Sequence, residues 1–242
     1  MDKIRHGRPD PVTLPALWVG VLPILVVNLC LVISIQAQTI PNCIPYLEGC
    51  TSVSAAGRNP PSIYLFRLVM LPTAAALILF WVINHRWLDL LRGEPETRGT
   101  VILWLGVIGA VFLGVYVTFL GTEGDFQRLM RRYGIYVFFA FTALAQLLTA
   151  RDMLASATKR GDRRIRLHAL IILWLCAGML MMGLTNVVLK AILPDPDQAE
   201  NVIEWNFAIL MQAFFLIAWR SWKHTGLEAR MLLRPPERPA DG

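Results

Sequence analysis

Six long apolar windows dominate this sequence and limit what the chain can fold into. Four windows contain no charged residue: Leu14–Gln36, 100–120, 133–150 and 169–189. The windows 63–83 and 202–219 contain one charged residue each, Arg67 and Glu204. A bilayer core about 30 Å thick needs roughly 20 apolar residues per helical span, so these lengths predict six transmembrane segments.

The windows favour helices over strands, because each is about twice as long as a barrel strand and lacks its alternation of polar and apolar residues. The composition agrees, since 55% of the 242 residues are hydrophobic and only 17% are charged. We predict an all-α, polytopic membrane protein with a six-helix transmembrane domain over residues 14–222. A segment 1–13 precedes it and a tail 223–242 follows it. We expect the first window to be retained, because Ile35-Gln36-Ala37 is a poor cleavage site for a signal peptide.

Basic residues are divided unevenly between the two sets of segment ends. Of the 23 lysines and arginines, all but six lie on one side. The six on the other side are Arg58, Arg67, Arg128, Arg131, Arg132 and Lys190. Short cytoplasmic loops carry an excess of Lys and Arg, so we predict that both termini are cytoplasmic. The same bias accounts for the net charge of +6, and we expect membrane lipids, not nucleic acid, as partners.

Two cysteines lie close together in the loop between the first and second windows. Cys43 and Cys50 fall on the side predicted to be extracytoplasmic, where an oxidising compartment favours disulfides. We predict a Cys43–Cys50 disulfide that stiffens the segment leading to Ser52.

Polar residues at membrane depth are the strongest functional signal, because burying an ionisable group in lipid is costly. Arg67 and Glu204 both lie about five residues into their windows, or roughly 7 Å deep at 1.5 Å per residue. Asn186 lies at the same end of the fifth window. These three residues are interpreted as a polar cluster that holds a lipid head group. A structural ion pair between Arg67 and Glu204, with no ligand, explains them equally well.

The first outer loop carries a recognisable pattern: Ser52-Val53-Ser54, Ala56-Gly57, Pro60-Pro61 and then Phe66-Arg67. It resembles the Ser-Ile-Ser, Gly, Pro and aromatic-Arg pattern of the DRAM/FRAG/SFK family. That family includes damage-regulated autophagy modulators and post-GPI-attachment lipid-remodelling factors. The pair Glu204-Trp205 is similar to an acidic-aromatic pair there, whereas the outer-loop histidine of several branches is missing. The resemblance implies six helices, cytoplasmic termini and a role in membrane lipid remodelling.

In this pattern the small residues form a turn whose backbone amides face an anion above Arg67. We therefore predict that the ligand-binding residues are Ser52, Ser54, Gly57, Arg67, Asn186 and Glu204. An ordinary loop that crosses the helix ends would use the same residues.

Three functions follow as hypotheses. The first is lipid handling or lipid binding without catalysis, in the plasma (inner) membrane of a bacterium or an endomembrane of a eukaryote, with a membrane-protein partner as a further expectation. The second is a lipid-remodelling enzyme in which Glu204 or Glu123 acts as a base, although no nucleophile is evident. The third is a small-solute transporter, for which broken helices or an internal repeat would be typical.

Familiar motifs of soluble enzymes do not occur in the sequence. It has no Walker loop, no G-x-S-x-G, no C-x-x-C and no histidine pair with metal-ligand spacing. We accordingly predict no cofactor and no metal site.

Overall fold

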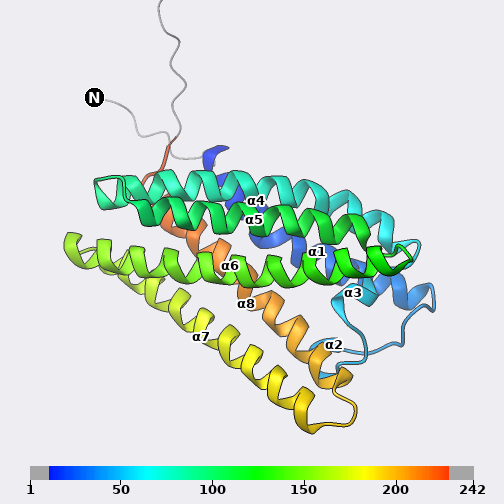
Figure 1. Cartoon of the computed structure of the whole chain (residues 1–242). Helices are drawn as coiled ribbons and strands as arrows, with labels where there is room; N and C mark the ends of the chain where they lie inside the picture. Colours follow the sequence, from blue (N-terminus) through cyan, green and yellow to red (C-terminus); the bar gives the residue numbers. More distant parts are fainter. Residues whose placement is uncertain (1–10, 229–242) are drawn as a thin grey trace, which may run out of the picture.

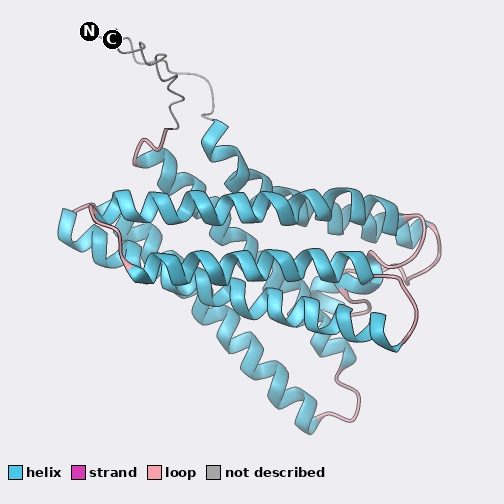
Figure 2. Ribbon diagram, turned by 45° about the horizontal axis from the view of Figure 1, so that its top comes forward, coloured by secondary structure: helices cyan, strands magenta, loops and turns pink. Residues whose placement is uncertain are grey.

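The computed structural model describes residues 11–228, and within that range it contains helices and no strands (Figures 1 and 2). The long helices are α1 (Leu14–Gln36), α4 (Ser62–Arg92), α5 (Thr97–Phe119), α6 (Asp125–Arg160), α7 (Arg163–Ile192) and α8 (Asp197–His224). A short 3₁₀ turn, η1 (Pro11–Thr13), precedes α1, and two single-turn helices, α2 (Pro45–Glu48) and α3 (Val53–Ala56), lie between α1 and α4. Six helices are long and apolar enough to cross a membrane, which confirms the predicted all-α, six-span class.

Most of the long helices extend beyond the windows expected from hydropathy. The first window coincides with α1, whereas α6 begins at Asp125 instead of residue 133 and continues to Arg160 instead of ending at residue 150. A helix carries on into the head-group region, where charged side chains are tolerated, so a window free of charge underestimates its length. Most of the predicted N-terminal segment and tail, residues 1–10 and 229–242, lies outside the described residues.

The six long helices form a closed ring in which each one contacts its neighbours in the order α1, α4, α5, α6, α7, α8 and back to α1. Large aromatic side chains of α4 and α8 fill the centre: Phe80, Trp81, Phe214, Phe215 and Trp222, each at most 1% exposed. The ring of Phe80 lies 4.9 Å from that of Phe215 and 5.0 Å from that of Trp222. Edge-on and offset aromatic pairs of this kind stabilise a core beyond the area they bury.

The two ends of the bundle differ in their connections. We call the end with the loops 37–61, 120–124 and 193–196 the disulfide end, and the end with the turns 93–96 and 161–162 the opposite end. Because the number of long helices is even, α1 begins and α8 ends at the opposite end. The location of that end in the cytoplasm stays a prediction from the basic-residue bias.

The α6–α7 turn at the opposite end has clear local causes. Gly161 closes α6 in the left-handed conformation, with φ 70°. Asp162 then caps α7, because its Oδ1 accepts the N–H groups of Arg164 and Ile165 at 2.9 and 3.1 Å. The pKa of the Asp162 carboxyl is held below its usual range, first by the Ile165 N–H and then by the nearby His224 imidazole and the Arg164 N–H.

From this turn α7 diverges from α6 toward the disulfide end (Figure 1, green and yellow ribbons). Apolar side chains on the far half of α7 are exposed, among them Leu180, Leu184, Val187 and Ile192. Lipid would cover this surface in a bilayer. The divergence leaves a wedge between α6, α7 and α8 at the disulfide end.

A glycine allows α4 and α5 to approach closely near the middle of the bundle. A Cβ atom at Gly106 of α5 would lie 2.2 Å from ring atoms of Trp81 on α4. Trp81 is fully buried and packs between Phe80 and Phe214, so its indole has no room to shift. Small residues at helix crossings are the usual means of close packing in membranes.

We expect Gly106→Ala to lower the thermal unfolding midpoint in detergent, because the added methyl group overpacks the core by about 1–3 kcal/mol. The matched control is Gly114→Ala on the same helix, where the nearest atom would be Ala74 Cβ at an ordinary 3.9 Å. Equal midpoints for the two variants would show that α4 and α5 are not packed through Gly106.

A buried ionic network joins three helices at the opposite end. The Asp152 side chain on α6 is 1% exposed and accepts from Arg92 of α4 at 2.5 Å and from Arg98 of α5 at 3.2 Å. Arg92 also pairs with Asp89 at 2.6 Å. A carboxylate this deeply buried is tolerated because two guanidinium groups neutralise it.

Replacing Asp152 with Asn should lower the free energy of unfolding by about 3 kcal/mol, because the buried Arg92 loses one of its carboxylate partners. Thermal or denaturant unfolding in detergent measures the change. Asp125→Asn is the control, since Asp125 pairs with Arg128 at the surface, where an ion pair contributes little. A midpoint for Asp152→Asn as high as that of the control would mean that the network does not support the bundle.

Candidate functional site

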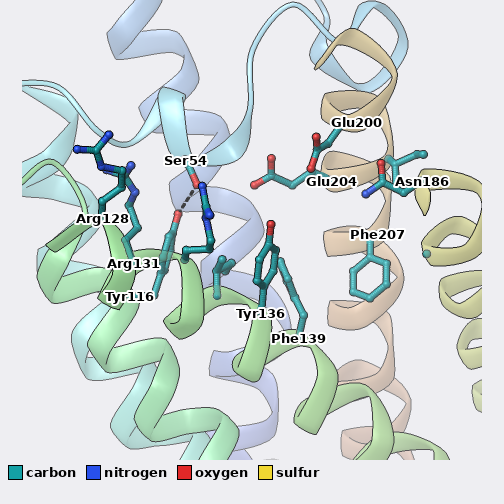
Figure 3. A pocket seen from close by; sticks show the side chains of 14 residues that line it. Ser54, Tyr116, Arg128, Arg131, Tyr136, Phe139, Asn186, Glu200, Glu204 and Phe207 are labelled. Atoms are coloured by element: carbon teal, nitrogen blue, oxygen red, sulfur yellow. Dashed lines mark hydrogen bonds between the residues drawn. The ribbon is translucent and has the colours of Figure 1, made fainter. Parts of the chain in front are cut away.

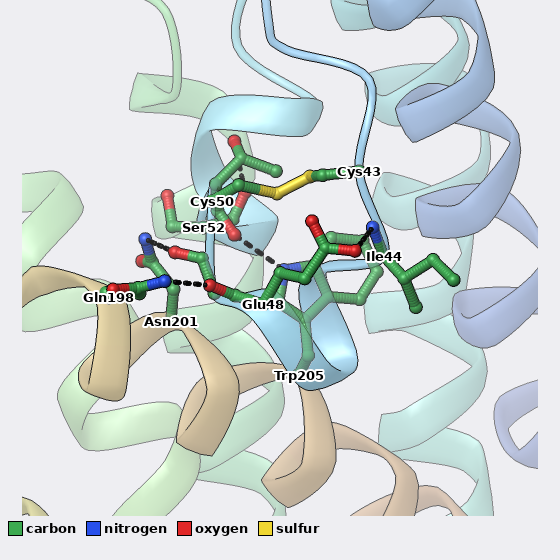
Figure 4. Close-up of a disulfide and its surroundings, with 10 residues drawn as sticks. Cys43, Ile44, Glu48, Cys50, Ser52, Gln198, Asn201 and Trp205 are labelled. Carbon is green, nitrogen blue, oxygen red and sulfur yellow. Dashed lines mark hydrogen bonds between the residues drawn. A yellow bond between two sulfur atoms is a disulfide. The ribbon is translucent and has the colours of Figure 1, made fainter.

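The loop at the disulfide end is held against α8 by backbone oxygens. The predicted disulfide between Cys43 and Cys50 is confirmed, and it closes the segment that contains α2 (Figure 4). Four side chains of α8 donate to carbonyl oxygens of this loop: Gln198 to Glu48 at 2.7 Å, Asn201 to Gly49 at 2.8 Å, Trp205 to Thr51 at 2.9 Å and Asn206 to Tyr46 at 2.9 Å. The loop is therefore fixed in place directly beside the first turns of α8.

Two of the predicted ligand residues have structural contacts in the next segment. The Ser52 hydroxyl caps α3 by accepting the N–H of Ala55 at 3.0 Å. A Cβ at Gly57 would lie 2.7 Å from the ring of Phe66, so this glycine allows the loop to pass over α4. Neither residue lines a described cavity.

The wedge at the disulfide end holds a cavity of about 420 Å³ (Figure 3). Its walls come from α6, α7 and α8, with Ser54 of α3 and Tyr116 of α5 at one side. The lining includes three of the predicted residues, Ser54, Asn186 and Glu204. We call this space the lateral cavity, because it lies where α7 diverges from α6.

Glu204 of α8 points into the lateral cavity (Figure 3). Its carboxyl lies near the backbone N–H groups of Val53 and Ser54 at the start of α3. The Ser54 hydroxyl lies 2.8 Å from the Tyr116 hydroxyl, and either oxygen is able to donate. Tyr116 is held there by a close crossing of α5 and α6, since a Cβ at Gly134 would lie 2.8 Å from the Tyr116 nitrogen.

The α7 wall supplies a polar atom without a partner. Asn186 Oδ1 is buried and has no hydrogen-bond partner within residues 11–228. One turn further on, Lys190 pairs with Glu200 of α8 at 2.7 Å and ties the two helices together at the rim. A buried carbonyl oxygen without a donor is costly, so Asn186 is suited to a ligand that donates a hydrogen bond.

Arg67 does not join this cluster. Its Nη2 donates to the backbone oxygens of Leu120 at 2.6 Å and Thr118 at 3.2 Å, the last carbonyls of α5. The alternative of an ion pair between Arg67 and Glu204 is thus wrong, and Arg67 lines none of the described cavities. The arginine whose charge acts on Glu204 is Arg58.

Three arginines that line the lateral cavity were expected in a loop. Arg128, Arg131 and Arg132 lie in the first turns of α6 and face the cavity from the side opposite Glu204. Two signals in the sequence mark them: they lie on the side that is poor in basic residues, and their spacing by three and four residues places them on one helical face.

Apolar side chains complete the lateral cavity and continue beyond it. Ile135, Phe139 and Phe207 line its inner part. A second, narrow cavity of about 60 Å³ shares Tyr116, Ile135, Phe139 and Glu204 with it and reaches Gln212 and Phe215 in the centre of the bundle. The site therefore changes from polar at the rim to apolar inside, which suits an amphiphilic ligand.

Comparison with known proteins gives one match. The family model described as the Frag1/DRAM/Sfk1/Cwh43P N-terminal domain matches residues 12–225. The searches of curated proteins and of solved structures found no match. The matched range includes the loop segment 52–67, the Glu204-Trp205 pair and all six long helices in full. The chain belongs to the Frag1/DRAM/Sfk1/Cwh43P family.

Proposed function

We propose that this protein handles membrane lipid by taking a lipid molecule from the surrounding bilayer into the lateral cavity. The observation that carries the proposal is the position of the cavity, in the wedge between α6 and α7, two helices that are long and apolar enough to cross a membrane. Its volume of about 420 Å³ lies in the range of small-molecule sites. The host membrane would be the plasma (inner) membrane in a bacterium or an endomembrane in a eukaryote.

The lining matches the two chemical parts of a lipid. Hydroxyl, amide and carboxyl groups of Ser54, Asn186 and Glu204 meet a polar head group at the rim. Ile135, Phe139 and Phe207 meet the beginning of an acyl chain, whose remainder would lie along the exposed apolar surface of α7. The ligand would enter sideways from the bilayer, because α7 lies apart from α6 at this end.

One observation favours a second candidate, lipid remodelling by an enzyme. The Ser54 hydroxyl lies 2.8 Å from that of Tyr116, and Glu204 lines the same cavity. In such an enzyme the Ser54 oxygen would attack the ester carbonyl, and the Glu204 carboxylate would take the serine proton and return it to the leaving alcohol. Release of fatty acid from an ester lipid by the wild type, and its loss in Ser54→Ala, would favour this candidate over binding alone.

The lipid proposal predicts that one lipid class remains bound when the protein is extracted and examined by native mass spectrometry. Glu204→Gln and Asn186→Leu should each reduce that enrichment by about tenfold, because each removes polar contacts worth roughly 1.4 kcal/mol. Thr118→Val is the matched control, since Thr118 is exposed, lies outside the cavity and uses its hydroxyl only within α5.

All three variants are compared at equal folded yield, judged by unfolding midpoints. Enrichment that survives both cavity substitutions, or that falls equally in Thr118→Val, would contradict lipid binding at this site.

A further inference from the structure

A second polar cavity of about 340 Å³ adjoins the lateral cavity at the disulfide end. It is lined by Arg58, Asn59, the 121–124 loop, Arg128 and Arg131. Arg128 and Arg131 line both cavities, so a ligand in one is within reach of the other. We call Arg58, Arg128 and Arg131 the arginine cluster.

The arginine cluster carries positive charge that its surroundings compensate only in part. No carboxylate among residues 11–228 lies within ion-pair distance of Arg58 or Arg131, and Arg128 pairs only with the exposed Asp125. Arg131 lies within electrostatic range of Arg58, Arg128 and Arg132. Three arginines and one glutamate, Glu123, line this second cavity. Asp125 and Glu204 act on Arg128 and Arg58 from outside it, so positive charge is least compensated at Arg131, whose charged neighbours are arginines. Like charges held this close repel each other unless an anion lies between them.

Local geometry also leaves donors free. Arg58 Nε is buried and has no hydrogen-bond partner in the described part of the chain. The 121–124 loop approaches Arg58 closely, because a Cβ at Gly121 would lie 2.7 Å from the Arg58 carbonyl oxygen. Gly121 and Gly124 take φ values of 78° and 116°, which glycine adopts without strain. The loop therefore folds back over the cluster with a glycine at each of its ends, and its two side chains, Thr122 and Glu123, line the cavity.

We propose that the arginine cluster binds a phosphate group. Several guanidinium groups that converge on one open space match the many oxygens and the charge of about −2 of a phosphate monoester. Two sources share this chemistry: the head group of a lipid in the lateral cavity, and a free phosphate ion.

Binding of a lipid phosphate by the cluster rests on the proposed function, whereas binding of a free phosphate ion does not. Because Arg128 and Arg131 line both cavities, a lipid seated at Glu204 and Asn186 would bring its phosphate to the cluster. This adds a selectivity rule: the cavity should prefer a lipid with a phosphate monoester to the same lipid without it.

The test is native mass spectrometry of the full chain in detergent with dioleoyl phosphatidic acid and with dioleoylglycerol. The wild type should bind phosphatidic acid about tenfold more tightly. Arg58→Gln and Arg131→Gln should lose this preference while still binding dioleoylglycerol. Arg86→Gln, which removes the same charge at an exposed position on α4, should keep it.

Inorganic phosphate separates the two sources. If phosphate, compared with chloride at equal ionic strength, displaces phosphatidic acid and raises the unfolding midpoint of the wild type but not of Arg131→Gln, the free ion is a ligand in its own right. If the arginines strengthen the binding of phosphatidic acid but inorganic phosphate has neither effect, the bound phosphate group is that of the lipid head group.

Two further results separate this inference from the proposed function. Equal binding of both lipids by the wild type, or a preference that survives both arginine substitutions, overturns the phosphate site and leaves lipid binding intact. Stabilisation by phosphate without binding of either lipid supports the anion site and overturns the proposed function.

Discussion

Backbone polar groups inside a bilayer have no water to bond with, and this constraint shapes the disulfide end more than any other part of the fold. Irregular backbone lies there between α1 and α4 and at the end of α5. Arg67 satisfies carbonyls of Thr118 and Leu120, and Trp205 satisfies that of Thr51. The Ser34 hydroxyl bonds the Ala56 carbonyl oxygen at 2.8 Å in the same region. Several polar side chains at this end therefore serve to donate hydrogen bonds to backbone carbonyl oxygens that no helix satisfies.

In the lateral cavity, by contrast, polar side chains face an open space. Its α8 wall carries the carboxyl of Glu204, its α6 wall carries Arg131, and its α7 wall carries the unpaired oxygen of Asn186. The two walls of opposite charge are kept apart because α7 diverges from α6 toward the disulfide end while it stays packed against α8, to which Lys190 and Glu200 tie it at the rim. A ligand with a charged head and an apolar tail fits between them without any rearrangement of the helices.

Hydropathy was sufficient to predict the spans, because each one must present about 20 apolar residues to lipid. The distance of each residue from the end of its apolar window likewise predicted that Asn186 and Glu204 lie at the same end of the bundle, and both line one cavity with Ser54. Depth says nothing about direction, however, and Arg67 lies at the depth of Glu204 but points to the end of α5. The arginines of α6 were placed in a loop because a charge-free window stops before the helix does, so the basic wall of the site was missed. Whether the six predicted residues bind a ligand stays a prediction.

The loop that covers the site is held by hydrogen bonds that side chains of α8 donate to its backbone. Every hydrogen bond from Gln198, Asn201, Trp205 and Asn206 to this loop ends on a backbone oxygen, and none ends on a loop side chain. Every residue type has the same backbone carbonyl oxygen, so these bonds do not select the loop residues that accept them, whereas they do require the donor side chains on α8. Specific residues are needed at the cysteine pair and at Gly49, where a Cβ would lie 1.9 Å from the Gln198 oxygen, and at Tyr46, whose hydroxyl accepts from Asn28 and whose ring packs edge-on against Trp205. Substitution of Glu48 or Thr51 would therefore leave the carbonyl bonds to Gln198 and Trp205 in place, as long as the loop backbone keeps its path.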